Sequence, residues 1–63
     1  SSTLRIQFIR MQCEDSSTDR QICAQTIQKY LKEVPEIASS EEFKKLKETF
    51  DIKVEGENIW VGR

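Results

Sequence analysis

The sequence contains no histidine, a single proline and only two glycines. Without histidine, nucleophilic catalysis needs an activated serine, cysteine or lysine beside another base, and no motif places such a pair. The glycines, Gly56 and Gly62, fall in an expected turn and near the chain end, so they form no phosphate-binding loop. These absences predict a binding module rather than an enzyme, with no cofactor and no small-molecule substrate.

Long apolar runs and an excess of one charge are also missing. No apolar stretch approaches the roughly 20 residues that span a bilayer, and the N-terminus lacks the basic-then-apolar order of a signal peptide. Ten basic residues against eleven acidic ones give a net charge of −1, which removes the strong electrostatic argument for nucleic acid. We therefore expect no membrane contact. Phosphates could be attracted only by a local basic face.

The length of 63 residues suits one hydrophobic core and is too short for two domains. A chain this short buries only roughly 60 % of its unfolded surface, so it depends on well-packed helices, a partner, a disulfide or neighbouring sequence. It starts without an initiator methionine and stops just after an apolar run. We expect 1–63 to be a single small domain excised from a longer protein, with its oligomeric state left open.

Two cysteines, Cys13 and Cys23, lie ten residues apart. With no CxxC motif and no histidine, a zinc site within one chain is not expected. A disulfide is one alternative, but Cys23 falls on the apolar stripe of an expected helix, where cysteine usually acts as a small core residue. Two free thiols are the favoured prediction, and they favour an intracellular protein, cytoplasmic or nuclear.

The first element is expected to be a strand. From Leu4 to Phe8 the apolar side chains alternate with Arg5 and Gln7, which is the period of a strand with one buried face. The alternation slips after Phe8, where the strand should bulge or end, and a polar loop is expected over residues 12–17.

Two helices should follow this strand. Thr18 and Gln21 form a capping box at the start of the first, and Pro35 ends it by disfavouring a helical residue before it. Ser39 with Glu42 caps the second, which is short and amphipathic. The expected apolar stripes are Cys23, Ile27, Tyr30, Leu31 and Val34 in the first helix, and Phe43, Leu46 and Phe50 in the second.

The C-terminal residues 52–61 predict a β-hairpin around the turn Glu55-Gly56-Glu57-Asn58. With Gly56 and Glu57 at the centre of the turn, Val54 faces Ile59 and Ile52 faces Val61. The same register sets Lys53 opposite Trp60 on the other face.

The order strand, helix, helix, hairpin predicts an α+β fold of the type β-α-α-β-β. Its sheet should be three-stranded and mainly antiparallel, with both helices on one face. The residues expected to be largely buried are Leu4, Ile6, Phe8, Ile27, Leu31, Phe43, Leu46, Ile52, Val54, Ile59 and Val61.

Trp60 carries the first candidate site, because the register turns it away from the face that Ile59 and Val61 share. With Lys53 beside it, and Arg5 and Gln7 on the corresponding face of the first strand, it predicts an aromatic and basic platform for a base or a peptide. The alternative is that Trp60 covers the sheet edge, packs on neighbouring sequence or stacks with Lys53.

Charged runs on the helices carry the remaining candidates. Lys44, Lys45 and Lys47 on the second helix, with Lys29 and Lys32 on the first, predict a patch that contacts phosphates; the alternative is a solvated face. The acidic pairs Glu14-Asp15 and Glu41-Glu42 are interpreted as charges that favour a helix start, not as cation ligands or acid–base groups.

The run from Leu46 to Val61, with its helix end, its Glu-Gly turn and its Ile59-Trp60-Val61 strand, resembles the second half of a KH domain. The resemblance implies the β-α-α-β-β core of that family and binding of single-stranded RNA or DNA. The junction Pro35-Glu36-Ile37-Ala38 stands where the family has its GXXG loop, and the family's final helix is absent. The resemblance therefore implies a degenerate member of the family, which binds nucleic acid with reduced affinity or binds protein instead.

A winged-helix domain is the competing interpretation, if its first helix was cut away. The helix at 40–50 would then be the recognition helix, and its lysines would face a DNA groove. The function classes left open are nucleic-acid binding and protein–protein interaction through a sheet edge or a helix face.

Overall fold

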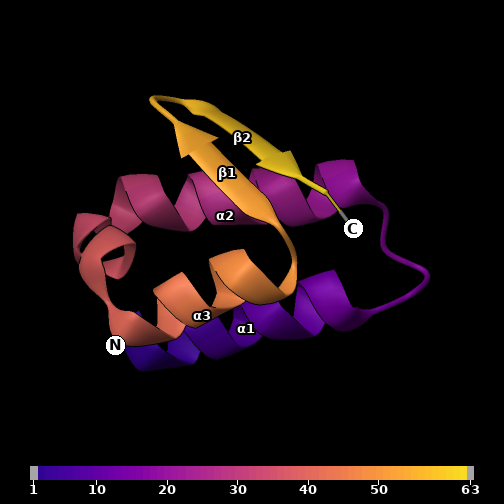
Figure 1. Cartoon of the computed structure of the whole chain (residues 1–63). Coiled ribbons are helices and arrows are strands. Elements are labelled where there is room, and N and C mark those ends of the chain that lie inside the picture. Colours follow the sequence, from indigo (N-terminus) through magenta and orange to yellow (C-terminus); the bar gives the residue numbers. More distant parts are fainter. Residues whose placement is uncertain (1, 63) are drawn as a thin grey trace.

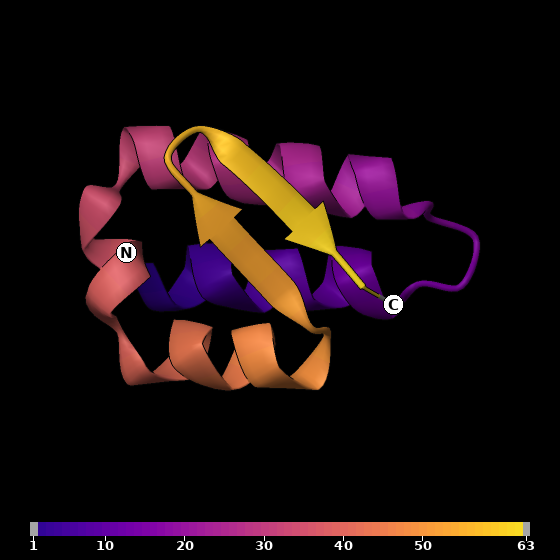
Figure 2. The same cartoon turned by 45° about the horizontal axis from the view of Figure 1, so that its top comes forward.

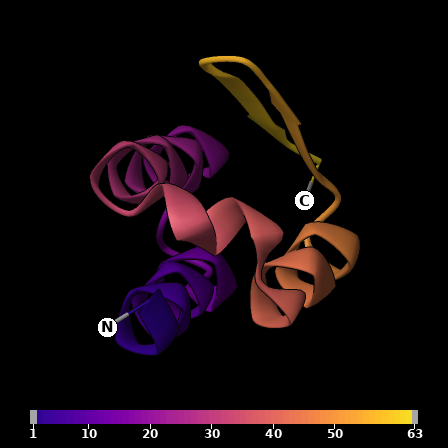
Figure 3. The same cartoon turned by 90° about the vertical axis from the view of Figure 1, so that its left-hand side faces the viewer.

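Three α-helices and a hairpin make up residues 2–62, the part of the chain that the computed structural model describes. The elements are α1 (Ser2–Glu14), α2 (Arg20–Glu33), the 3₁₀ helix η1 (Pro35–Ser39), α3 (Glu41–Thr49), β1 (Ile52–Glu55) and β2 (Asn58–Val61). Seen from one end, α1, α2 and α3 surround the core, and the hairpin closes the side between α2 and α3 (Figures 1 and 3). Within residues 2–62, no helix has the length and apolar composition to cross a bilayer.

The predicted strand at residues 4–8 is wrong, because this segment belongs to α1. Its apolar residues lie on two opposite faces of a helix: Ile6 and Ile9 point into the core, whereas Leu4 and Phe8 are exposed. A helix that is apolar on two faces mimics the alternation of a strand over a short window. The fold is therefore α-α-α-β-β with a two-stranded sheet, and the β-α-α-β-β order with three strands and two helices on one face is not formed.

Side-chain caps begin α2 and α3, each one residue later than the sequence predicts. The Asp19 carboxylate, not Thr18, accepts a hydrogen bond from the Ile22 N–H at 2.9 Å. The Ser40 hydroxyl, not Ser39, accepts one from the Phe43 N–H at 3.2 Å. Each cap satisfies a backbone donor that has no partner inside the helix. As predicted, α2 ends before the proline, with Val34 at its C-cap.

The junction between α2 and α3 forms η1, which the sequence did not predict. Pro35 stands at its first position, and the fully buried Ile37 packs into the core. The backbone N–H of Ser40 donates to the Ile37 carbonyl at 3.1 Å, so η1 leads directly into the N-cap of α3. The junction is therefore a short helical segment packed on the core rather than an open loop.

A disulfide joins Cys13 on α1 to Cys23 on α2, so the prediction of two free thiols is wrong. The Cα atoms are 5.1 Å apart, within the range that a disulfide spans. Cys23 is also a buried core residue, as its position on the apolar stripe predicts, and a core position does not prevent bridging when the partner helix is adjacent. The expectation of an intracellular location rested on free thiols and now stays a prediction without that support.

The hairpin has the predicted register: Ile52 pairs with Val61, Lys53 with Trp60 and Val54 with Ile59. At its turn Gly56 has a φ of 62°, a conformation that glycine adopts without steric cost. The hairpin runs diagonally over the helices (Figure 2), with β1 against α3 and β2 against α2.

Two contacts hold the turn of the hairpin on α2. The Gln28 side-chain amide donates to the Glu57 carbonyl at 3.2 Å, and the Lys32 ammonium lies 3.6 Å from the Glu57 carboxylate. Both involve the turn itself, so the hairpin is fixed at its tip as well as along its strands.

The core lies between the three helices and the inner face of the hairpin. It consists of Ile6, Ile9, Cys23, Ile27, Ile37, Phe43, Leu46, Phe50 and Ile52. Of the residues predicted to be buried, Leu31, Ile59 and Val61 are half-buried at its edge, and Leu4, Phe8 and Val54 are exposed. Leu4 and Phe8 are exposed because α1 is a helix and not a strand, and Val54 lies next to the turn of the hairpin.

Candidate functional site

A groove between α3 and β1 brings together lysines from two parts of the chain. Its lining residues are Lys44, Lys47, Glu48, Asp51, Ile52, Lys53 and Val54. Lys44 and Lys47 stand three residues apart and share one side of α3. The chain turns at Asp51, which has a φ of 52°, and this turn brings β1 and its Lys53 back alongside the helix.

The two α3 lysines are partly held in place by neighbours. The Lys47 ammonium lies 5.7 Å from the centre of the Phe43 ring, a cation–π contact made by a half-buried lysine on a core aromatic residue. The Lys44 ammonium lies 3.6 Å from the Glu41 carboxylate, and both side chains are largely exposed. Exposed pairs of this kind contribute at most about 1 kcal/mol, so Glu41 holds the Lys44 ammonium only weakly.

Two carboxylates in the groove limit its positive charge. Asp51 is turned toward the end of β2, where its carboxylate lies so close to Gly62 that a Cβ there would collide with it. The Gly62 N–H also donates to the Asp51 carbonyl at 3.0 Å. Glu48 is exposed on α3. Three lysines against two carboxylates leave the groove with a net positive charge of one on a chain whose net charge is −1.

Trp60 extends this groove onto the outer face of the hairpin. Its side chain is 50 % exposed, and Lys53, its cross-strand partner, belongs to the groove. Side chains directly opposite each other on antiparallel strands have Cβ atoms about 5 Å apart. The indole and the lysine cluster therefore form one surface, which we call the α3–hairpin surface: Lys44, Lys47, Lys53 and Trp60.

The other predicted site residues lie elsewhere. Arg5 and Gln7 are on α1, so the platform that was to join them to Trp60 through a shared sheet does not exist. Gln7 and Lys45 line a different crevice, between α1 and α3. The two lysines of α2 have other partners. The Lys32 ammonium pairs with the Glu57 carboxylate, and the Lys29 ammonium lies 5.9 Å from the centre of the Tyr30 ring.

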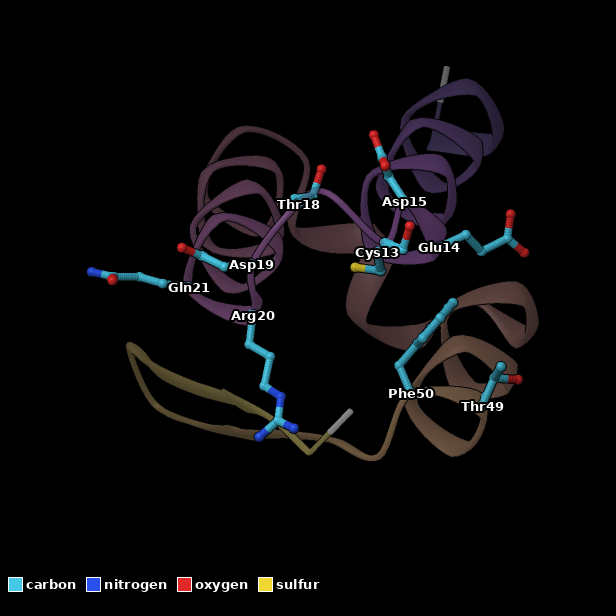
Figure 4. A pocket seen from close by; sticks show the side chains of 10 residues that line it. Cys13, Glu14, Asp15, Thr18, Asp19, Arg20, Gln21, Thr49 and Phe50 are labelled. Carbon is cyan, nitrogen blue, oxygen red and sulfur yellow. The ribbon is translucent and has the colours of Figure 1, made fainter.

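A third pocket lies where the α1–α2 loop faces the end of α3 (Figure 4). It is lined by Cys13, Glu14, Asp15, Ser16, Thr18, Asp19, Arg20, Gln21, Thr49 and Phe50. In Figure 4 the Phe50 ring points toward α1, whereas the Glu14, Asp15 and Asp19 carboxylates diverge. Among the described residues, no group of three or more His, Cys, Asp or Glu side chains is placed to hold a metal ion.

The carboxylates of this pocket have local structural partners. Asp15 accepts hydrogen bonds from the Ser17 N–H at 3.0 Å and the Ser17 hydroxyl at 2.7 Å, and these bonds lower the pKa of Asp15. Glu14 lies 3.7 Å from the Arg10 guanidinium, at the end of α1 rather than before a helix start. Glu41 and Glu42 do occupy the first turn of α3, as predicted.

Sequence reasoning missed one surface, the outer face of α1. Leu4, Phe8 and Met11 are all exposed there. Their spacing of four and three residues is a helical signal, which was hidden because Leu4 and Phe8 were assigned to the buried face of a strand.

Comparison of this chain with models of protein families, with curated proteins and with solved structures finds no match, so its function is argued from the geometry above.

Proposed function

We propose that this protein is a non-catalytic module that binds single-stranded nucleic acid through the α3–hairpin surface. The observation that carries the proposal is that four of the residues singled out in the sequence lie on one surface although they come from three elements, α3, β1 and β2: Lys44, Lys47, Lys53 and Trp60. Lysines in a groove beside an exposed aromatic ring are the combination that tracks a sugar-phosphate backbone and stacks an unpaired base.

The hairpin sets the geometry of this contact. A strand of nucleic acid in the α3–β1 groove has its phosphates near the lysines, and a base that leaves the groove over Lys53 reaches the face of Trp60. Paired bases in a duplex are already stacked and do not offer that face. The exposed indole therefore favours a single strand over a duplex.

The charge balance makes the expected affinity low. Three lysines neutralise at most about three phosphates, which corresponds to a slope of log K against log salt of about −2 for a single strand. The acidic Glu48 in the groove and the net charge of −1 weaken the attraction further. Dissociation constants of roughly 10⁻⁴ to 10⁻⁶ M at physiological salt are the range for such backbone contacts.

Fluorescence anisotropy with a labelled single-stranded oligonucleotide, at two salt concentrations, tests the proposal. Lys53→Gln should weaken binding and flatten the salt slope by about 0.7, the contribution of one phosphate. Lys45→Gln is the control, because it removes the same charge from α3, on the side of that helix that faces α1 and not the groove. Trp60→Ala should weaken binding by roughly 1–3 kcal/mol through lost stacking.

Three outcomes contradict the proposal. One is equal weakening by Lys45→Gln and Lys53→Gln, which would indicate diffuse attraction to the whole chain. Another is tighter binding of the matching duplex, which would assign the surface to double-stranded DNA, as expected of a winged-helix domain. The last is unchanged affinity of Trp60→Ala.

A further inference from the structure

The two cysteines of the disulfide differ in their access to solvent. Cys23 is 2 % exposed and belongs to the core, whereas Cys13 is half-buried at the core's edge, one residue before α1 ends. Cys13 lines the pocket between the α1–α2 loop and the end of α3, and Cys23 does not. In Figure 4 the Cys13 sulfur points from α1 toward α2, at the wall of this pocket. A small molecule that enters the pocket therefore meets Cys13 and not Cys23.

The acidic side chains of the pocket leave the Cys13 sulfur uncovered. The Asp15 carboxylate accepts two hydrogen bonds from Ser17, and the Asp19 carboxylate caps α2. These bonds hold both carboxylates in the loop, and in Figure 4 both point away from the Cys13 sulfur. Access to this sulfur is therefore not closed by a neighbouring charged group.

A disulfide is opened when a thiolate attacks one of its two sulfurs. The incoming sulfur has to reach the attacked atom directly, and burial in the core denies that approach at Cys23. Attack at Cys13 forms a new S–S bond between Cys13 and the incoming thiol, and it breaks the bond to Cys23. The electron pair of the broken bond leaves on the Cys23 sulfur, which then takes a proton from water. One disulfide replaces another, so the step needs no oxidant.

From this difference in access we infer that Cys13 is a site of reversible modification by small-molecule thiols. The product carries the small thiol in disulfide linkage on Cys13 and a free thiol at Cys23. The Cys23 thiolate reverses the reaction when it attacks Cys13 and expels the small thiol. The modification also unties α1 from α2, because the bond between these two cysteines is the covalent link that joins the helices across their loop.

This site is separate from the α3–hairpin surface. The pocket that holds Cys13 shares no lining residue with the α3–β1 groove, and Trp60 does not line it. The inference therefore does not depend on the proposed function, and oligonucleotide binding can be measured without any thiol present.

The test maps which cysteine acquires the thiol. The folded protein is incubated with 2-mercaptoethanol, and samples taken early are quenched with acid, because the attacking species is the thiolate. N-ethylmaleimide then alkylates the free thiols and blocks further exchange. Trypsin cuts after Arg10, Arg20 and Lys29, so the two cysteines fall in separate peptides, 11–20 and 21–29. The mass of each peptide shows whether it carries mercaptoethanol or maleimide.

We expect mercaptoethanol on peptide 11–20 and maleimide on peptide 21–29, in at least roughly tenfold excess over the reverse pattern, because access controls which sulfur is attacked. The matched control is the same reaction in concentrated urea, where both sulfurs are exposed. The two patterns should form there in comparable amounts. The preference in the absence of urea is then a property of the fold and not of the sequence around each cysteine.

A second measurement shows whether the folded chain is the species that reacts. Ser40→Ala removes the cap of α3 at the end of this helix away from the pocket, and it should raise the unfolded population roughly fivefold. If the thiol attacks the folded chain, the variant should open at the same rate as the unaltered chain. In both proteins this rate should rise in proportion to the thiol concentration.

Comparable amounts of the two patterns in the folded chain, or an excess of mercaptoethanol on Cys23, would overturn the inference. Roughly fivefold faster opening of Ser40→Ala would also overturn it, because the unfolded chain would then be the reactive species. So would a folded chain that does not react with a thiol concentration that opens the disulfide in urea, since Cys13 would then be as inaccessible as Cys23.

Discussion

Opening the Cys13–Cys23 disulfide should cost this protein a large part of its stability. The bond ties α1 to α2 across a sequence separation of ten residues, and α1 supplies Ile6 and Ile9 to the core. In the chain-entropy model, closing a loop of this size in the unfolded chain stabilises the folded state by about 2.7 kcal/mol. Small domains have a total stability on the order of 5 kcal/mol, so the loss is a major fraction of it.

Thermal unfolding followed by circular dichroism measures this loss. For a domain of this size, 1 kcal/mol corresponds to roughly 4–8 °C in melting temperature, so reduction should lower the midpoint by roughly 10–20 °C. The double variant Cys13→Ala and Cys23→Ala should melt in the same lowered range and be insensitive to reductant. That insensitivity separates breaking the bond from other effects of the reducing agent.

An unchanged midpoint after complete reduction would refute this reasoning, because it would show that the helices hold α1 without the bond. Mass spectrometry that finds two free thiols in folded protein prepared under air would also refute this reasoning, because no disulfide would then be present to open. Free thiols would then again favour an intracellular location.

Three further predictions concern single side chains. Leu46→Ala should cost on the order of 2–5 kcal/mol in chemical denaturation because Leu46 is a buried core residue, and Lys45→Ala beside it should cost little. Ser40→Ala should cost roughly 1 kcal/mol in the same assay, since it removes the acceptor that caps α3. The hydrogen bonds from Ser17 lower the pKa of Asp15, so whatever stability it contributes is present above its unfolded pKa and is lost as the pH falls through its folded pKa. A carboxyl NMR titration should place its midpoint lower in the folded chain than in urea, and equal midpoints would contradict this.

The C-terminal half of the fold was predictable because its signals are local. The turn at Gly56 fixes the pairing of neighbouring residues, so the Lys53–Trp60 pair followed from alternation alone. The caps of α2 and α3 were placed within one residue, because Thr18 and Asp19, like Ser39 and Ser40, are neighbouring residues that can both cap. Choosing between them requires the backbone angles of the folded chain.

The N-terminal half was not predictable from alternation because α1 is apolar on two faces. Ile9 and Met11 break the strand pattern, and their positions fit the two stripes of a helix. No proline occurs before Pro35 and no glycine before Gly56, which is a further signal in favour of helices. The strand was predicted from the alternation at residues 4–8 alone, and the hairpin forms a two-stranded sheet without it.

The candidate site was predictable residue by residue but not as an arrangement. Helical spacing shows that Lys44 and Lys47 share a side of α3. Their meeting with Lys53 depends on how the turn at Asp51 directs β1, which is a property of the folded chain. Arg5 was included only because its segment was assigned to the sheet, and it left the site when that segment proved to be helical.

A ¹H–¹⁵N NMR titration with a short single-stranded oligonucleotide at low salt tests whether the α3–hairpin surface binds nucleic acid. We expect shifts of the Trp60 indole signal and of the amides at Lys44, Lys47 and Lys53, with the signals of α1 unmoved. Binding in the millimolar range is enough to be seen in this way. Shifts confined to α1, or no shift of the Trp60 indole at millimolar oligonucleotide, would contradict a nucleic-acid site on the α3–hairpin surface.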